Sequence, residues 1–142
     1  MNLPIVNRSH HPLPAYQTTG AAGFDLTANL ETPISLAPLE RAVIDTGLYF
    51  GIPEGFELQI RPRSGLAAKF GLTVLNAPGT IDADYRGELK VIMVNLSAQA
   101  YTIHDGDRIA QAVLGPSTRA NLTVVDTLDE TVRGEGRFGH TG

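Results

Sequence analysis

Asn76-Ala-Pro-Gly-Thr-Ile-Asp-Ala-Asp-Tyr-Arg-Gly-Glu88 joins two short apolar runs, Leu72–Leu75 and Leu89–Val94. The Pro-Gly pair is typical of a turn and the second run is rich in β-branched residues, so the segment is predicted to form a β-hairpin. A plain turn has no need of Tyr85 and Arg86, which lie in the same connection. A hairpin can offer backbone N–H and C=O groups to a flat ligand while its side chains take charged or stacking roles. The segment therefore predicts either an inert turn or a ligand-binding hairpin.

Further short apolar runs indicate more strands around this hairpin. Phe56–Ile60 alternates apolar and polar residues, the pattern of a half-buried strand. The other predicted strands are Phe24–Leu26, Arg41–Phe50, Leu89–Asn95, Tyr101–Ile103, Ile109–Leu114 and Leu122–Val125, and the only predicted helical turn is Ser64–Phe70. Many short strands, punctuated by 15 Gly and 9 Pro, predict an all-β sandwich or barrel. We expect one domain over residues 1–127 and a tail over residues 128–142.

Composition excludes several classes of protein. The 142 residues are enough for a single domain with a real core, and the absence of Cys rules out disulfides and thiolate metal sites. No apolar run is long enough to span a membrane and no signal peptide precedes the domain, so a soluble cytoplasmic protein is expected. The net charge of −4 argues against a nucleic-acid partner. The basic residues are nine Arg and two Lys, which favours fixed contacts to small anions.

Two segments near the first strands carry charged groups that a fold alone does not require. Asp25 lies between apolar neighbours, where a carboxylate is costly unless it accepts hydrogen bonds or meets a cation, although it could simply cap a turn. Pro62–Ala67 follows the clearest strand. Its Ser64-Gly65 pair enters a helical turn whose free N–H groups can bind an anion, with Arg63 beside them. An ordinary N-cap is the alternative.

Two later segments are equally rich in polar groups. Gly106–Gln111 is a turn followed by a strand, and Gln111 would need a hydrogen-bond partner on a buried face. The last ten residues, Arg133–Gly142, contain four glycines and no apolar periodicity, which is typical of a flexible tail. They also supply a cation, an aromatic ring and a hydroxyl, the composition of a flap that orders on a ligand.

In this order, the five segments resemble the dUTPase (deoxyuridine 5'-triphosphate nucleotidohydrolase) family of trimeric all-β pyrophosphatases, from Ala21 to Gly142. The most diagnostic parts are Pro62–Ala67 and Gly79–Gly87. The tail is similar to the family pattern RGxGGFGSTG but has Arg137 where Gly is usual and His140 where Ser is common. The resemblance implies a jelly-roll-like β-sandwich or barrel whose flexible Gly-rich tail closes over the active site.

The resemblance also implies a reaction: hydrolysis of dUTP to dUMP and pyrophosphate, for dUMP biosynthesis, by in-line attack of water on the α-phosphorus. Asp82 matches the acid that activates the water, and Asp25 the acid that reaches a Mg²⁺ ion through water. The implied phosphate contacts are Arg63, Ser64, Gly65 and Gln111. In the tail, Arg133 matches a γ-phosphate contact and Phe138 a ring over the uracil, with Gly139 and Thr141 as further contacts.

Selectivity for uracil is expected from the hairpin. The backbone near Thr80, Ile81 and Lys90, with the amide of Asn76, could complement the acceptor–donor–acceptor edge of uracil, whereas cytosine reverses two of these partners. Each unpaired buried polar group would cost about 1–3 kcal/mol. Tyr85 resembles the residue that packs on the deoxyribose and excludes a 2′-hydroxyl.

The segments are too widely spread for one small domain to bring to one cleft. The resemblance implies a homotrimer whose active sites are shared between subunits. Two other functions stay open on sequence alone, namely a dCTP deaminase of the same fold and a catalytically silent nucleotide-sensing or protein-interaction domain. The histidines are assigned no role, because His10, His11 and His104 show no metal-ligand spacing on a recognisable element.

Overall fold

A computed structural model describes all residues, 1–142, and consists of ten strands and one helix. The elements are β1 (Ile5–Asn7), β2 (Phe24–Thr27), β3 (Ile34–Leu36), β4 (Arg41–Phe50), β5 (Phe56–Arg61), α1 (Ser64–Phe70), β6 (Leu72–Val74), β7 (Gly79–Ile81), β8 (Leu89–Asn95), β9 (Tyr101–Ile103) and β10 (Arg108–Pro116). The structure contains no helix whose length and apolar character would let it cross a lipid bilayer.

The strands form two four-stranded sheets and one two-stranded sheet. The orders are β1-β4-β8-β6, β2-β10-β5-β7 and β3-β9, and every pairing is antiparallel. Neighbours in each large sheet are distant in the chain, as in a jelly-roll-like sandwich. The predicted all-β fold class is therefore confirmed.

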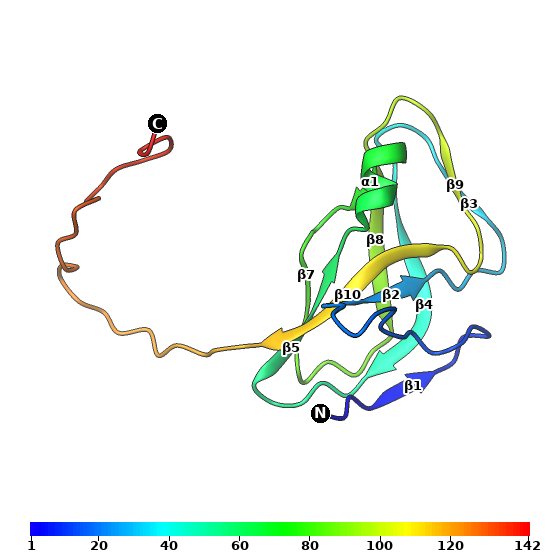
Figure 1. Ribbon diagram of the computed structural model, residues 1–142, viewed down its shortest axis with the longest axis horizontal. Coiled ribbons are helices and arrows are strands. Elements are labelled where there is room, and N and C mark those ends of the chain that lie inside the picture. The colour runs from blue at the N-terminus through cyan, green and yellow to red at the C-terminus, as the bar shows by residue number, and fades with distance from the viewer.

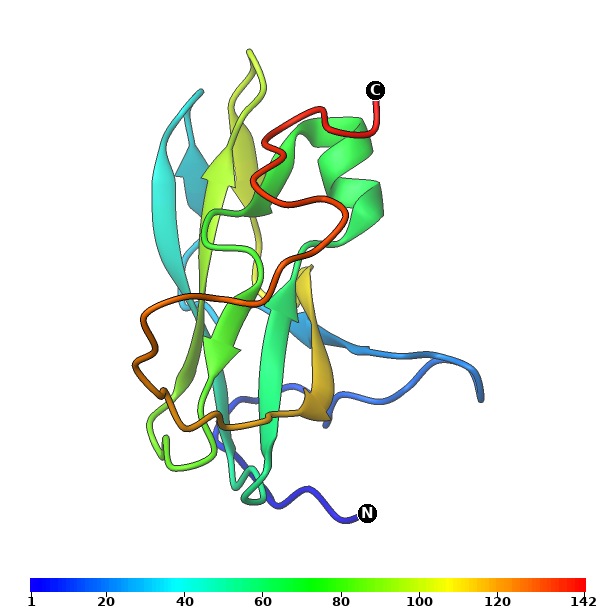
Figure 2. The ribbon, with the colours of Figure 1, turned by 90° about the vertical axis from the view of Figure 1, so that its left-hand side faces the viewer.

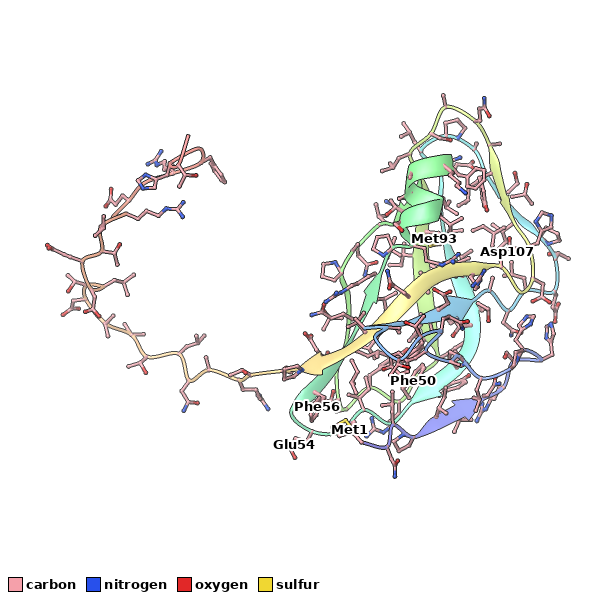
Figure 3. All side chains as sticks on the ribbon, viewed as in Figure 1. Met1, Phe50, Glu54, Phe56, Met93 and Asp107 are labelled. Atoms are coloured by element: carbon pink, nitrogen blue, oxygen red, sulfur yellow. The ribbon has the colours of Figure 1, made fainter.

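Apolar side chains from both large sheets meet in one core. Leu58 and Ile60 on β5 alternate with exposed or half-buried neighbours, and Leu89 and Val91 do the same on β8, which is buried throughout from Met93 to its end. This period of two directs one face of each strand inward. Nineteen buried apolar residues form a single cluster, and Figure 3 labels Met93 within it.

The predicted hairpin is present, but the connection between its two strands also contains a strand that belongs to the other sheet. β6 and β8 pair antiparallel with Val74 opposite Met93. Between them, β7 leaves this sheet and pairs with β5 in the other one. Figure 2 shows β5 rising toward α1 and β7 running beside it in the opposite direction. The segment Asn76–Glu88 thus links the two sheets of the sandwich.

The C-terminal segment has no regular structure. β10 ends at Pro116, and residues 117–142 contain no helix or strand. The last hydrogen bond to the sandwich joins the Ser117 N–H to the Gly55 carbonyl oxygen, at 2.8 Å. Figure 1 shows the chain beyond this point running away from the strands. The strand predicted over Leu122–Val125 is wrong, because no neighbouring strand lies there to pair with it.

Candidate active site

Asp25 is held between two guanidinium groups. The Nε of Arg63 donates to its Oδ1 at 3.1 Å, and the Nη1 of Arg108 donates to its Oδ2 at 3.3 Å. The Nη1 of Arg63 also donates to the carbonyl oxygen of Arg108, at 3.1 Å. Two cations against one carboxylate leave net positive charge at this point. We call Asp25, Arg63 and Arg108 the arginine cluster.

Sheet register brings the cluster together. Gln111 on β10 lies opposite Asp25 on β2 and opposite Arg61 on β5, so the three strands align side by side. The Nε2 of Gln111 donates to the Pro62 carbonyl oxygen at 2.9 Å, and this contact holds the residue before Arg63 against β10. A Cβ on Gly23 would lie 2.9 Å from the Ala112 carbonyl oxygen, so only glycine permits this close approach of β2.

Helix α1 begins beside the arginine cluster. Arg63 occupies the N-cap position, and no side chain caps the helix. Ser64 is therefore the first helical residue and not the cap. Both Ser64 and Gly65 are exposed, and a Cβ on Gly65 would meet nothing within 4 Å. The first backbone N–H groups of a helix lack intrahelical partners, so this surface can accept an anion.

A second group of predicted residues surrounds a pocket between β7 and β8. The pocket has a volume of about 340 Å³ and is lined by Thr80, Ile81, Asp82, Tyr85 and Lys90, together with Val43, Glu88 and Ile92. We call it the hairpin pocket. Asn76 is exposed and lies beside Gly79, outside this lining. Five of the predicted substrate and catalytic residues therefore share one hollow.

Local contacts fix the walls of the hairpin pocket. The Tyr85 hydroxyl donates to the Glu88 carbonyl oxygen at 2.9 Å, and the ring covers Gly87 so closely that a Cβ there would overlap it. The Nζ of Lys90 lies 2.8 Å from the Asp45 carboxylate and 3.4 Å from that of Glu88. The hydrogen bond to Asp45, followed by the negative charge of Glu88, raises the pKa of Lys90.

Asp82 follows the end of β7 and is exposed. It lines the hairpin pocket and also a larger hollow of about 630 Å³, whose charged lining includes Glu57, Arg86 and Arg119. No hydrogen bond or ion pair occupies its carboxylate. An exposed, unpaired carboxylate at the mouth of a pocket can accept a proton from water.

Asp82 and the arginine cluster lie at opposite ends of β5. Ile81 pairs with Leu58 near the start of this strand, whereas Arg63 lies two residues beyond its last residue, Arg61. The five steps from residue 58 to residue 63 span about 16 Å at ~3.3 Å per residue of extended chain. In Figure 3, Glu54 and Phe56 mark one end of the sheet and Asp107, next to Arg108, marks the other. A single chain thus does not bring Asp82 to the cluster.

The predicted tail residues stand apart from both groups. Phe138 is fully exposed, and the Nε of Arg133 donates only to the nearby Gly136 carbonyl oxygen, at 3.1 Å. Gly139 and Thr141 are exposed in the same segment. The structure therefore places the predicted site residues other than Asn76 in three separate groups: the arginine cluster with Gln111 and α1, the hairpin pocket, and the tail.

One cluster of side chains of the types that can bind a metal ion is not visible in the sequence. His10 and His11 both contact the carboxylate of Asp105. The partners are more than 90 residues apart in the chain, so no spacing rule could detect them. Only the fold brings them together.

The family of the chain follows from its similarity to known proteins. The dUTPase family model matches residues 9–142. The deoxyuridine 5'-triphosphate nucleotidohydrolase of Finegoldia magna is 54% identical over 142 residues, which cover 100% of this chain and 99% of that protein. The enzyme of the same name from Bdellovibrio bacteriovorus is 59% identical over 133 residues, covering 94% and 89%.

Solved structures agree with these relatives. The Staphylococcus bacteriophage 80alpha dUTPase with dUPNHPP has a TM-score of 0.89 and 28% identity, and covers 99% of this chain and 98% of that one. A mutant dUTPase from phage phi11 of S. aureus, described with a structural Mg(II) ion, has a TM-score of 0.82 and 25% identity, covering 92% and 100%. The chain therefore belongs to the dUTPase family and is an enzyme of that family.

Proposed function

We propose that this chain hydrolyses dUTP to dUMP and pyrophosphate in the cytoplasm, with Asp82 as the general base. The observation that carries the proposal is the hairpin pocket, which gathers Thr80, Ile81, Tyr85 and Lys90 with Asp82 at its mouth. A structural neighbour, the phage 80alpha dUTPase, is described with dUPNHPP, whose name matches a dUTP analogue. A pocket for a nucleoside next to a free carboxylate is what this reaction requires.

In the proposed reaction, water attacks the α-phosphorus in line with the oxygen that bridges to the β-phosphorus. A new P–O bond to water forms, the bridging bond breaks, and pyrophosphate leaves with the electron pair. Asp82 takes the proton from the water. General-base assistance of this kind contributes about 10²–10⁴ in rate.

The hairpin supplies the proposed base selectivity. The backbone of β7 near Thr80 and Ile81, the backbone of β8 at Lys90 and the Asn76 amide complement the uracil edge. Tyr85 packs on the deoxyribose. Its close packing over Gly87 and its hydrogen bond to the Glu88 carbonyl oxygen support this role, because they hold the ring where it would exclude a 2′-hydroxyl.

The arginine cluster and the start of α1 supply the proposed phosphate site. Arg63 carries the positive charge, and Ser64 and Gly65 present exposed backbone beside it. Gln111 acts at the same place, and its hydrogen bond to the Pro62 carbonyl oxygen supports a role in positioning Arg63.

The donor atoms of the cluster are compatible with Mg²⁺ held mainly by the substrate. Asp25 is the single carboxylate there, and both of its oxygens already accept hydrogen bonds from arginines. One such carboxylate suits a hard ion that keeps its waters and phosphate ligands. Asp25 would then contact the ion through water, and the ion would supply positive charge against the triphosphate.

A homotrimer with shared sites accounts for the separation of the groups. Asp82 and Arg63 lie at opposite ends of β5 in one chain, so a complete site needs the hairpin pocket of one chain and the arginine cluster of another. The third chain would supply its exposed tail, which would close over this site with Arg133, Phe138, Gly139 and Thr141.

The test is pyrophosphate release from dUTP, dCTP, dTTP and UTP in turn, with and without Mg²⁺. We expect release from dUTP alone and dependence on Mg²⁺. Asp82→Asn should abolish turnover while nucleotide binding, measured by calorimetry, is retained. Asp84→Asn, the same change two residues away on the same exposed turn, is the matched control. Full activity of Asp82→Asn would remove this carboxylate from the mechanism.

A further inference from the structure

His10, His11 and Asp105 converge at the surface between the N-terminal segment and the turn that joins β9 to β10. The Nε2 of His10 lies 2.6 Å from Oδ2 of Asp105, and the Nε2 of His11 lies 2.8 Å from its Oδ1. One candidate ligand atom from each residue can be chosen so that all three lie within 4.8 Å of one another. The three residues belong to none of the groups assigned to catalysis.

The histidine side of this cluster is held in shape by its own loop. The chain bends over residues 9–11, one residue after the end of β1. Asn7 fixes the bend, because its Nδ2 donates to the His11 carbonyl oxygen at 2.8 Å and its Oδ1 accepts from the Ser9 N–H at 2.9 Å. The bend lets two adjacent imidazoles face one carboxylate, with ring centroids 4.2 Å apart.

The carboxylate side is fixed independently. The Leu30 N–H donates to Oδ1 of Asp105 at 2.9 Å. Gly106 follows with φ of 81°, a conformation that favours glycine, and a Cβ there would lie 3.3 Å from the His11 ring. The turn therefore presents Asp105 outward and leaves room for the imidazole.

We propose that His10, His11 and Asp105 bind a divalent transition-metal ion of the zinc class. With ligand bonds of about 2.0–2.2 Å, a tetrahedral site needs ligand atoms about 3.3–3.6 Å apart. The observed N–O separations of 2.6 and 2.8 Å are shorter than this spacing, so the ligand atoms would move apart by about 0.5–1 Å to admit the ion. His10 is 65% exposed and can move, and solvent supplies the fourth ligand.

The donor set separates this ion from the Mg²⁺ of the proposed active site. Two imidazole nitrogens and one carboxylate suit Zn²⁺, Co²⁺ or Ni²⁺, whereas Mg²⁺ prefers an all-oxygen shell. A bound ion would tie the segment after β1 to the β9–β10 turn. Because the ion would bind the folded chain only, it would also raise the temperature of unfolding.

The test is binding of Zn²⁺ and Co²⁺ to the full chain after treatment with a chelator, in the presence of a large excess of Mg²⁺. Equilibrium dialysis should give one Zn²⁺ per chain, and Co²⁺ should give the visible absorption bands of a tetrahedral nitrogen–oxygen site. Loss of a hydrogen-bond partner of a metal ligand costs about 10–100-fold in affinity, so loss of a ligand should cost at least about tenfold.

The variants are His10→Ala, His11→Ala and Asp105→Asn. His104→Ala is the matched control, because His104 is 62% exposed and adjacent to Asp105 but contacts Asp107 instead. His10→Ala is the most informative change, since an exposed side chain can be removed without unfolding the chain. Thermal unfolding without metal checks this for each variant.

We expect the three site variants to lose the tetrahedral spectrum and His104→Ala to keep it. Absence of Zn²⁺ binding by the unmodified chain would reduce the cluster to a hydrogen-bonded contact. Binding that persists in His10→Ala and His11→Ala alike, or that disappears in His104→Ala, would place the ion elsewhere. Pyrophosphate release by the variants is measured separately and does not decide the proposal.

Discussion

Gln111 donates a hydrogen bond from its side-chain Nε2 to the backbone carbonyl oxygen of Pro62, at 2.9 Å. This contact joins the middle of β10 to the residue that precedes Arg63, and Arg63 in turn binds Asp25 on β2. A glutamine on a sheet thereby sets the position of an arginine on the loop that leads into α1. The arginine cluster is positioned by the sheet itself and does not depend on the tail.

Gln111→Leu is expected to weaken both stability and activity. The lost hydrogen bond should lower the free energy of unfolding by about 1 kcal/mol. Displacement of Arg63 should reduce kcat/KM for dUTP by about 10–100-fold, because catalysis depends steeply on the position of charged groups. Denaturant unfolding and steady-state kinetics measure the two effects. Gln99→Leu, an exposed glutamine whose side chain makes no hydrogen bond, is the control; equal activity of the two variants would contradict the positioning role.

Gly87→Ala is expected to weaken discrimination between dUTP and UTP. The added methyl would overlap the Tyr85 ring and push it from its place. The ratio of kcat/KM for dUTP to that for UTP should then fall by about tenfold or more, since a displaced ring no longer excludes a 2′-hydroxyl. Gly115→Ala, where a Cβ would meet nothing within 4 Å, is the matched control. A preserved ratio in Gly87→Ala would show that Tyr85 does not read the sugar.

Tyr101 is expected to make the fold sensitive to alkaline pH. Burial raises the pKa of Tyr101, the charge of Asp107 adds to this effect and the charge of Arg63 opposes it. The folded chain therefore keeps the phenolic proton at a pH where the unfolded chain has lost it. Stability from this group is complete below about pH 10 and is lost as the pH rises through the folded pKa.

Tyr101→Phe should accordingly show a smaller fall in unfolding temperature above about pH 10 than the unmodified chain. Tyr16→Phe, at a side chain that is 52% exposed, controls for the loss of a hydroxyl group. Parallel curves for the unmodified chain and Tyr101→Phe would mean that Tyr101 does not contribute to the alkaline transition. Calorimetry over a pH series provides the measurement.

Removal of residues 133–142 is expected to cripple turnover and leave the fold intact. Beyond Ser117, the hydrogen bonds of the tail join only tail residues, and Phe138 is fully exposed. The unfolding temperature should stay unchanged, while kcat with dUTP falls by at least about 100-fold because the proposed cover over the substrate is missing. Phe138→Ala alone should reproduce part of the loss. Unchanged kinetics would show that residues 133–142 take no part in turnover.

The sequence predicted the elements that have a strong local pattern. Arg41–Phe50, Leu89–Asn95 and Ser64–Phe70 form with the predicted bounds, because β-branched runs or helix formers followed by Gly71 determine them locally. The prediction failed where the formation of a strand depends on a neighbouring strand to pair with. Leu122–Val125 has the residues of a strand but no partner strand.

The candidate site shows the same difference between features that the local sequence determines and contacts between residues that are far apart in the chain. The residue types on the hairpin and beside α1 could be predicted, because turn and helix-start chemistry is local. The contact of Asp25 with Arg63 and that of His10 with Asp105 join residues 38 and 95 positions apart. No spacing in the sequence encodes such pairs, since sheet order and register create them.

The length of β5 also has a consequence for mixtures of two inactive variants. Asp82 and Arg63 are separated along this strand, so in the proposed trimer a mutation at one of them would disable a different half of the shared site from a mutation at the other. Inactive Asp82→Asn chains can be unfolded, mixed in equal amounts with inactive Arg63→Ala chains and refolded together. If trimers then form at random, about a quarter of their sites should combine two intact halves. A mixture of two inactive variants would then regain activity by complementation between subunits.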